Sequence, residues 1–149
     1  GGILPIPFNA RFFGMSTSFT VAYGCVLAAA LLPIGCAGLA KSGKFKTPRK
    51  EGGYDNHNPR AWLANQADWR ARANAAQANS FEALPFFIGA VIIAHQLHAQ
   101  QTKLDILAFM FVFTRLIYIF MYVADMATAR SNAWTVGLAL NVAILFAGA

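Results

Sequence analysis

Charged residues are scarce in this chain: Asp, Glu, Lys and Arg together make up 12% of its 149 residues. Soluble domains carry about 25%, so we do not expect a soluble globular fold. Twelve glycines and six prolines are also too few for a collagen-like or disordered chain. Hydrophobic residues make up 57%, and they lie in blocks of about 20, the length that crosses a bilayer as a helix. The sequence therefore predicts a small polytopic membrane protein.

Cysteine is almost absent, since Cys25 and Cys36 are the only two and both fall in the first apolar block. On a helix they would lie roughly 16 Å apart, which is too far for a disulfide bond. We interpret both as small packing residues. The formal net charge of +6 comes from basic residues that cluster around one loop. In a membrane protein such a cluster indicates topology before nucleic-acid binding, which we do not expect.

Four apolar blocks are expected to span the membrane, with polar connections between them. They lie at 18–40, 71–94, 104–124 and 133–149. The first connection is a long loop at 41–69 and the others are short, so consecutive helices should be antiparallel neighbours. The predicted fold is all-α, an up-down bundle of four transmembrane helices in one domain, 15–149. Residues 1–14, ahead of Met15, are interpreted as an expression remnant.

The Lys and Arg side chains predict the orientation in the membrane. Only Lys103 lies on one side of the expected spans, whereas eight basic residues lie on the other. These eight are Lys41, Lys44, Lys46, Arg49, Lys50, Arg60, Arg70 and Arg130. By the positive-inside rule, the long loop should face the cytoplasm and both termini the outside. The loop would also touch anionic lipid, and in it Asn58 and Pro59 predict the start of a short helix.

Polar residues inside the second expected span carry the first functional indication. Arg72, Asn79 and Glu82 are separated by 7 and 3 positions, which places all three on one helix face. Ionisable groups are costly in hydrocarbon and normally face a bundle interior or a water-filled cavity, where they find a partner. We therefore expect this face to be turned away from lipid.

The third expected span supplies a candidate partner. Arg115, Tyr118 and Tyr122 are separated by 3 and 4 positions and share one face. Glu82 and Arg115 each lie roughly 16 Å from the cytoplasmic ends of their helices, near the middle of the bilayer. We predict that they form an ion pair. Such a pair could belong to a functional site, or it could only fix the register of the helices and the oligomeric state.

Two motifs resemble those of a known family. Residues 72–86, RANAAQANSFEALPF, contain Asn-x-x-Glu followed by Pro-Phe, and residues 115–122, RLIYIFMY, have the form Arg-x-x-Tyr-x-x-x-Tyr. Arg130 and Ser131 stand ahead of the last expected span. Together these segments resemble bacterial-type members of the MAPEG superfamily, membrane-associated proteins in eicosanoid and glutathione metabolism.

The resemblance implies a homotrimer in a bacterial inner membrane, with glutathione as co-substrate held between neighbouring subunits. Arg130 would stabilise the glutathione thiolate, and Ser131 would assist and cap the last helix. The residues that would contact glutathione or shape its site are Arg72, Asn79, Glu82, Arg115, Tyr118 and Tyr122. The chemistry suits a tripeptide, because guanidinium groups bind carboxylates, a carboxylate binds an α-amine, and a nearby guanidinium lowers the pKa of a thiol.

Two alanines depart from the family pattern. Ala75 stands four residues before the Asn of the motif, where the glutathione-using members usually carry arginine, and Ala78 stands directly before that Asn, where some members carry arginine. The loop at 41–69 is also longer than in the eicosanoid enzymes. Arg60 and Arg70 are the nearby basic residues that could replace the missing arginines.

The leading functional hypothesis is a detoxifying, glutathione-dependent transferase or peroxidase that acts on lipophilic electrophiles. A non-catalytic member that binds a lipid or small ligand is the alternative, which the two alanines favour. A small transporter or channel subunit is a third possibility, supported by the polar face within the membrane. His95 and His98 could share a metal ion, but catalytic zinc sites have three protein ligands, so no metal site is expected.

Overall fold

A computed structural model describes residues 18–149 of the chain, so the interpretation of residues 1–14 lies outside the described part. Every regular element in the described part is helical, which confirms the all-α prediction. The elements are α1 (Val21–Lys41), η2 (Arg49–Glu51), α2 (Pro59–Ala64), α3 (Asp68–Gln96), α4 (Gln101–Val123) and α5 (Ala127–Leu145).

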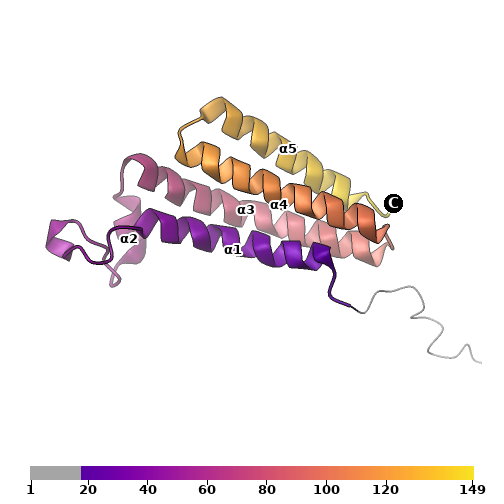
Figure 1. The fold of residues 1–149 in the computed structure, drawn as a ribbon, viewed down its shortest axis with the longest axis horizontal. Coiled ribbons are helices and arrows are strands. Elements are labelled where there is room, and N and C mark those ends of the chain that lie inside the picture. Colours follow the sequence, from indigo (N-terminus) through magenta and orange to yellow (C-terminus); the bar gives the residue numbers. More distant parts are fainter. Residues whose placement is uncertain (1–17) are drawn as a thin grey trace, which may run out of the picture.

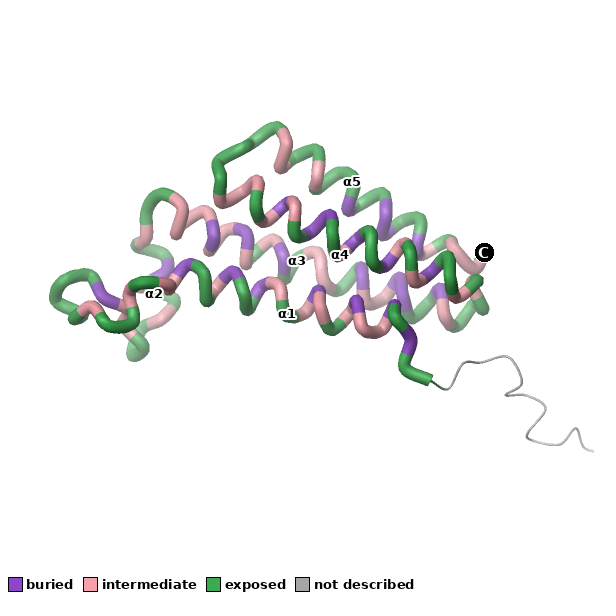
Figure 2. Tube along the Cα trace, viewed as in Figure 1, coloured by how far each residue is buried: buried purple, intermediate pink, exposed green. Residues whose placement is uncertain are grey.

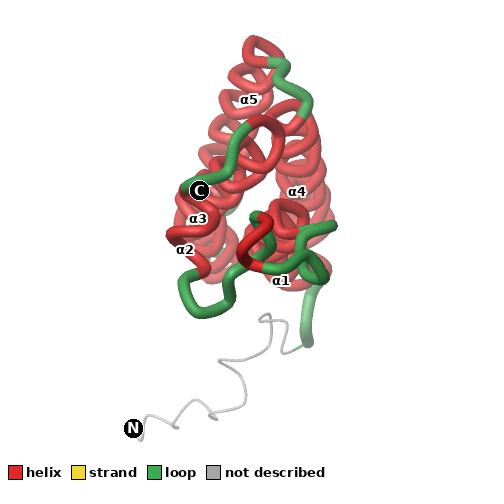
Figure 3. Tube along the Cα trace, turned by 90° about the vertical axis from the view of Figure 1, so that its left-hand side faces the viewer, coloured by secondary structure: helices red, strands yellow, loops and turns green. Residues whose placement is uncertain are grey.

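The four long helices lie side by side and run alternately in opposite directions (Figure 1). Helices α3 and α4 pack against each other in the middle, and α1 and α5 each pack on both of them. The end-on view places α1 and α5 on opposite sides of this central pair (Figure 3). The loop that carries η2 and α2 lies at the same end of the molecule as the α4–α5 turn, and the C-terminus lies at the other end (Figure 1).

Three of the helices, α1, α3 and α4, are long and apolar enough to cross a membrane. Helix α5 is not among them, because its first turns carry Arg130, Ser131 and Asn132. It begins at Ala127 and ends at Leu145, whereas the expected fourth span was 133–149. The turn from α4 into α5 is short, with Asp125 in the left-handed conformation at φ 60°. Arg130, Ser131 and Asn132, which were expected in the connection before the last span, are therefore part of α5.

Small side chains form the contact surface of α1. Its buried residues are Ala22, Cys25, Ala29, Pro33, Cys36 and Ala40, at spacings of three and four along the chain. Such a stripe lets neighbouring helix backbones approach closely. The two cysteines are free and buried in it, as their spacing predicted.

Large apolar side chains gather either in the centre or on the outside. Phe87 of α3 and Phe111 of α4 stack at the centre, with ring centroids 4.2 Å apart. On the outward faces Phe109 and Phe120 are 63% and 69% exposed. Figure 2 shows buried residues turned to the inside of the helix array and exposed ones to its outside. Exposed aromatic side chains on apolar helices suit a lipid environment.

The basic loop is ordered by contacts with the helix ends. Arg70 Nη1 donates hydrogen bonds to the backbone oxygens of Ala40 and Ser42, at 2.8 and 2.6 Å. Arg70, at the start of α3, thereby caps the C-terminal end of α1, where a positive charge is favourable. Helix α2 begins at Pro59 as predicted, although the side chain of Asn58 makes no capping hydrogen bond.

Asp105 of α4 caps the other end of α1. Its Oδ1 accepts hydrogen bonds from the backbone N–H of Ala22 at 2.9 Å and from Gln101 Nε2 at 2.6 Å. A carboxylate at a helix N-terminus satisfies an otherwise unpaired N–H and complements the helix dipole. Asp105 therefore fixes the position of α1 relative to α4.

We expect Asp105→Ala to lower the free energy of unfolding by about 1–2 kcal/mol, because an N-terminal cap between helices is lost. Thermal unfolding in detergent measures the effect. Asp105→Asn, which keeps an acceptor oxygen, should lose less, and Thr102→Ala at an exposed position of α4 should change little. Equal stability of Asp105→Ala and Thr102→Ala would contradict this role.

Candidate functional site

The polar centre of the protein is Arg115, which is 3% exposed in the middle of α4. Its Nη2 donates hydrogen bonds to Asn79 Oδ1 at 2.7 Å and to Ser80 Oγ at 3.4 Å, both on α3. Its guanidinium also lies 4.1 Å from the ring centroid of Tyr118, one turn along α4. A cation in this interior is thus held by two neutral side chains and an aromatic face.

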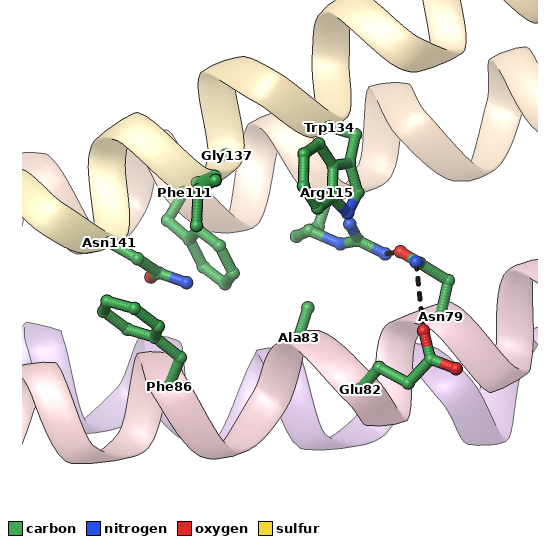
Figure 4. Close-up of a pocket in the computed structure, with 10 residues that line it drawn as sticks. Asn79, Glu82, Ala83, Phe86, Phe111, Arg115, Trp134, Gly137 and Asn141 are labelled. Carbon is green, nitrogen blue, oxygen red and sulfur yellow. Dashed lines mark hydrogen bonds between the residues drawn. The ribbon is translucent and has the colours of Figure 1, made fainter.

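The predicted ion pair between Glu82 and Arg115 is wrong in its direct form. Asn79 lies between them, since its Nδ2 donates to Glu82 Oε2 at 3.4 Å while its Oδ1 accepts from Arg115 (Figure 4). Glu82 itself is exposed on the surface of α3. Glu82 and Arg115 were predicted to lie at the same depth in the membrane, but the rotation of α3 about its axis turns the Glu82 carboxylate outward. The result is a relay of Arg115, Asn79 and Glu82.

A cleft between α4 and α5 brings together four of the eight site residues predicted from the sequence. Tyr118, Tyr122, Arg130 and Ser131 all line it, and it has a volume of about 270 Å³. The guanidinium of Arg130 lies 4.3 Å from the ring centroid of Tyr122. The two tyrosine rings meet edge to face, with centroids 5.7 Å apart. Aromatic rings therefore connect the buried Arg115 to the exposed end of the cleft.

Arg130 and Ser131 occupy the beginning of α5 rather than the connection before it. The residue that precedes the helix is Met126, so the expectation that Ser131 caps this helix is wrong. Ser131 lies one turn inside, where its backbone oxygen accepts a hydrogen bond from Thr135 Oγ1 at 3.0 Å. Arg130 is in the first turn, so it still lies at the positive end of the helix dipole.

Arg72 is held away from this cleft. Its Nε donates a hydrogen bond to the backbone oxygen of Val123, the last residue of α4, at 3.0 Å. A guanidinium at a helix C-terminus is favourable, and this bond ties α3 to α4. The structure therefore gives Arg72 a structural contact.

A second cavity, of about 180 Å³, adjoins the cleft between α3, α4 and α5 (Figure 4), and its lining includes exposed residues such as Glu82 and Trp134. Its lining residues are Asn79, Glu82, Ala83, Phe86, Phe111, Arg115, Trp134, Gly137, Leu138 and Asn141. Trp134 lines both the cleft and this cavity. Sequence reasoning missed Trp134 and Asn141. The available indication was their spacing of seven positions on one face of the last helix, with an amide inside an apolar segment.

The family is decided by a comparison of the sequence with family models. The model of the MAPEG family matches residues 21–149. The chain belongs to the MAPEG family. Together with three helices able to cross a bilayer, this makes it an integral membrane protein. No curated protein and no solved structure matches the chain.

The two alanines that depart from the expected family pattern lie in a groove of this MAPEG protein. Ala75 and Ala78 of α3 line it, together with Arg60 of α2. Arg60 is exposed there, whereas Arg70 is bound to the end of α1. Of the two basic residues considered as replacements, only Arg60 is therefore free to act in this groove.

The histidines give no indication of a metal centre in the MAPEG fold. Within residues 18–149, no group of three or more His, Cys, Asp and Glu side chains lies close enough to hold a metal ion. His95 packs against Tyr23 of α1, with ring centroids 5.3 Å apart. The packing gives His95 a contact between α3 and α1.

We expect the relay to be visible in double-mutant cycles. Arg115→Met and Asn79→Leu should each destabilise the protein by about 1–3 kcal/mol, because each leaves a buried polar group unpaired. The double mutant should lose less than the sum. Thermal unfolding of a second cycle, Arg115→Met with Glu82→Gln, should give a smaller coupling energy, because Glu82 touches Asn79 rather than Arg115. The reverse order of the two coupling energies would contradict the relay.

Proposed function

We propose that this protein is a membrane-bound, glutathione-dependent transferase or peroxidase that acts on lipophilic electrophiles. Family membership supports a role in glutathione-related chemistry. The observation that carries the proposal is the cleft, in which Arg130, Ser131, Tyr118 and Tyr122 meet. A thiol held there would face a guanidinium and the N-terminal end of α5, and both stabilise the thiolate, the nucleophilic form.

The remaining polar groups suit the rest of the tripeptide. Glu82 is exposed beside the cavity that adjoins the cleft, where its carboxylate would pair with the α-amine of glutathione. Asn79 holds this carboxylate and offers hydrogen bonds of its own. Arg60 is the free guanidinium on the α2–α3 side for a glycyl or glutamyl carboxylate. The lipophilic partner would enter from the bilayer.

The proposal includes a homotrimer of four-span protomers. Glu82 is exposed on α3 at a depth where lipid offers no hydrogen bonds, so a neighbouring protein surface must cover it. Asn74 and Gln77 line the groove on the same helix and add to its polar surface. In this arrangement α5 is the fourth span, with its polar first turns at the membrane surface. The basic loop faces the cytoplasm.

A non-catalytic member that binds a lipid or small ligand is the second candidate. The observation that favours it is the groove at Ala75 and Ala78, which carries one guanidinium, that of Arg60. Such a protein would keep the fold and the cleft but hold glutathione weakly. Binding of glutathione decides between the two candidates.

We expect native mass spectrometry in mild detergent to show a trimer, because the exposed carboxylate and amides of α3 need partners. Glu82→Leu should weaken the trimer if α3 lies at the interface. Phe109→Leu, on the outward face of α4, is the matched control and should leave it intact. A wild-type protein that is only monomeric or dimeric would contradict this assembly.

We expect Arg130→Ala to reduce kcat/KM for conjugation of glutathione with a chlorinated nitrobenzene by about 100-fold, the usual cost of losing one group that stabilises developing charge. Ultraviolet absorbance should show thiolate at neutral pH in the wild type, and only at higher pH in the variant. The sign follows from the chemistry, because loss of the guanidinium raises the pKa of the bound thiol. Lys46→Ala removes a positive charge from the same end and is the control.

One outcome would overturn the role of Arg130, and another the enzyme assignment itself. Activity that survives Arg130→Ala unchanged would show that Arg130 does not act on the thiol. Failure of the wild type to bind glutathione at millimolar concentration would exclude the enzyme and leave the ligand-binding candidate.

A further inference from the structure

The cavity between α3, α4 and α5 is lined mainly by apolar side chains, with polar groups at its two ends. Phe86, Phe111, Ala83 and Leu138 give it apolar walls, and its volume is about 180 Å³. Apolar cavities of about 150 Å³ in other proteins hold one benzene molecule. The space therefore fits a single aromatic ring with a small substituent.

Asn141 places a carboxamide with an unpaired oxygen at this cavity. Its side chain lines the cavity and is 3% exposed, and its Oδ1 has no hydrogen-bond partner within the described chain. Figure 4 places it beside Phe86, at the end of the cavity away from Arg115. A buried carbonyl oxygen without a hydrogen-bond partner is costly, because it has lost its bonds to water and gained none in return. A bound molecule that hydrogen-bonds with Asn141 would remove this cost.

We propose that this cavity binds a single aromatic ring that carries one hydroxyl or carbonyl oxygen. The ring lies between the phenyl groups of Phe86 and Phe111, and the oxygen meets the carboxamide of Asn141. A hydroxyl group both donates and accepts, so it fits this amide in either orientation. At the other end Arg115 Nε, also without a partner in residues 18–149, keeps that end polar.

Trp134 gives the cavity its connection to the proposed chemistry. It lines both this cavity and the cleft that contains Arg130, so a substituent on the bound ring would pass along Trp134 toward the thiol. The bound ring would then be the lipophilic substrate of the proposed reaction. Only this substrate role rests on the proposed function. Binding of the ring needs no glutathione.

The test is a fluorine NMR titration of 4-fluorophenol with the purified protein in lipid nanodiscs, without glutathione. We expect saturable broadening of the fluorine signal that excess unlabelled phenol reverses. Empty nanodiscs should give only linear partitioning. If the protein sample also gives only linear partitioning, the cavity holds ordered water at most and the proposal is overturned.

Variants locate the site. Gly137→Leu should abolish saturable binding, because Gly137 lines the cavity and a Cβ there already lies 3.8 Å from Phe111 Cε2. Gly35→Leu, at a glycine of α1 with no atom within 4 Å of its Cβ, is the matched control. Ala83→Leu fills the cavity from α3 and should also abolish saturable binding, so it replaces Gly137→Leu if that variant does not fold. Unchanged affinity in a folded, filled variant would overturn the proposal.

Asn141→Leu separates recognition of the oxygen from recognition of the ring. It should bind fluorobenzene as the wild type does, but bind 4-fluorophenol at least fivefold more weakly. Asn132→Leu, at an exposed position of α5, should alter neither affinity. Equal affinity for 4-fluorophenol in the wild type and Asn141→Leu would overturn the role of Asn141. A glutathione titration on the same samples tests the proposed function separately, since either ligand can bind when the other does not.

Discussion

The arrangement depends on one guanidinium in the apolar interior. Arg115 is buried on α4, and the partners that make it tolerable come from α3 and from its own helix: Asn79, Ser80 and the ring of Tyr118. An unpaired cation would be far too costly at that depth, so α3 and α4 must keep their relative rotation and register. The same constraint fixes the positions of the tyrosines one and two turns further along α4.

The cleft follows from this register. Tyr118 and Tyr122 carry the line of aromatic contacts from Arg115 to Arg130, and α5 adds Arg130 and Trp134 on the facing side. Trp134 then lies between a polar space at the helix end and a space with mostly apolar walls between α3, α4 and α5. The proposed reaction joins a thiol to a lipophilic molecule, which need different surroundings and yet must make contact. Two adjoining spaces of different polarity, separated by one side chain, would suit such a reaction.

Periodicity was enough to predict most of the helices and the shared face of the two cleft tyrosines, whereas Arg130 and Ser131 were predicted from the family resemblance. Apolar blocks located α1, α3 and α4, and spacings of three and four put Tyr118 and Tyr122 on the face of Arg115. Rotation of one helix against another has no such pattern in one sequence, so the direct pairing of Glu82 with Arg115 failed while Asn79 took its place. Asn141 was missed although it is an amide in an apolar segment, because its place at the cavity depends on how α5 packs against α3 and α4.

After the end of α4, helix packing determines the structure more than the local composition of the sequence does. Arg130, Ser131 and Asn132 have the composition of a connection, yet they are helical because Asp125 completes the turn within a few residues and α5 packs on α3 and α4. Helix formation carries Arg130 inside the first turn, where its guanidinium reaches the ring of Tyr122. Had α5 begun at residue 133, Arg130 would lie in an irregular segment without this contact. The earlier helix start is therefore what gives the cleft a positioned cation.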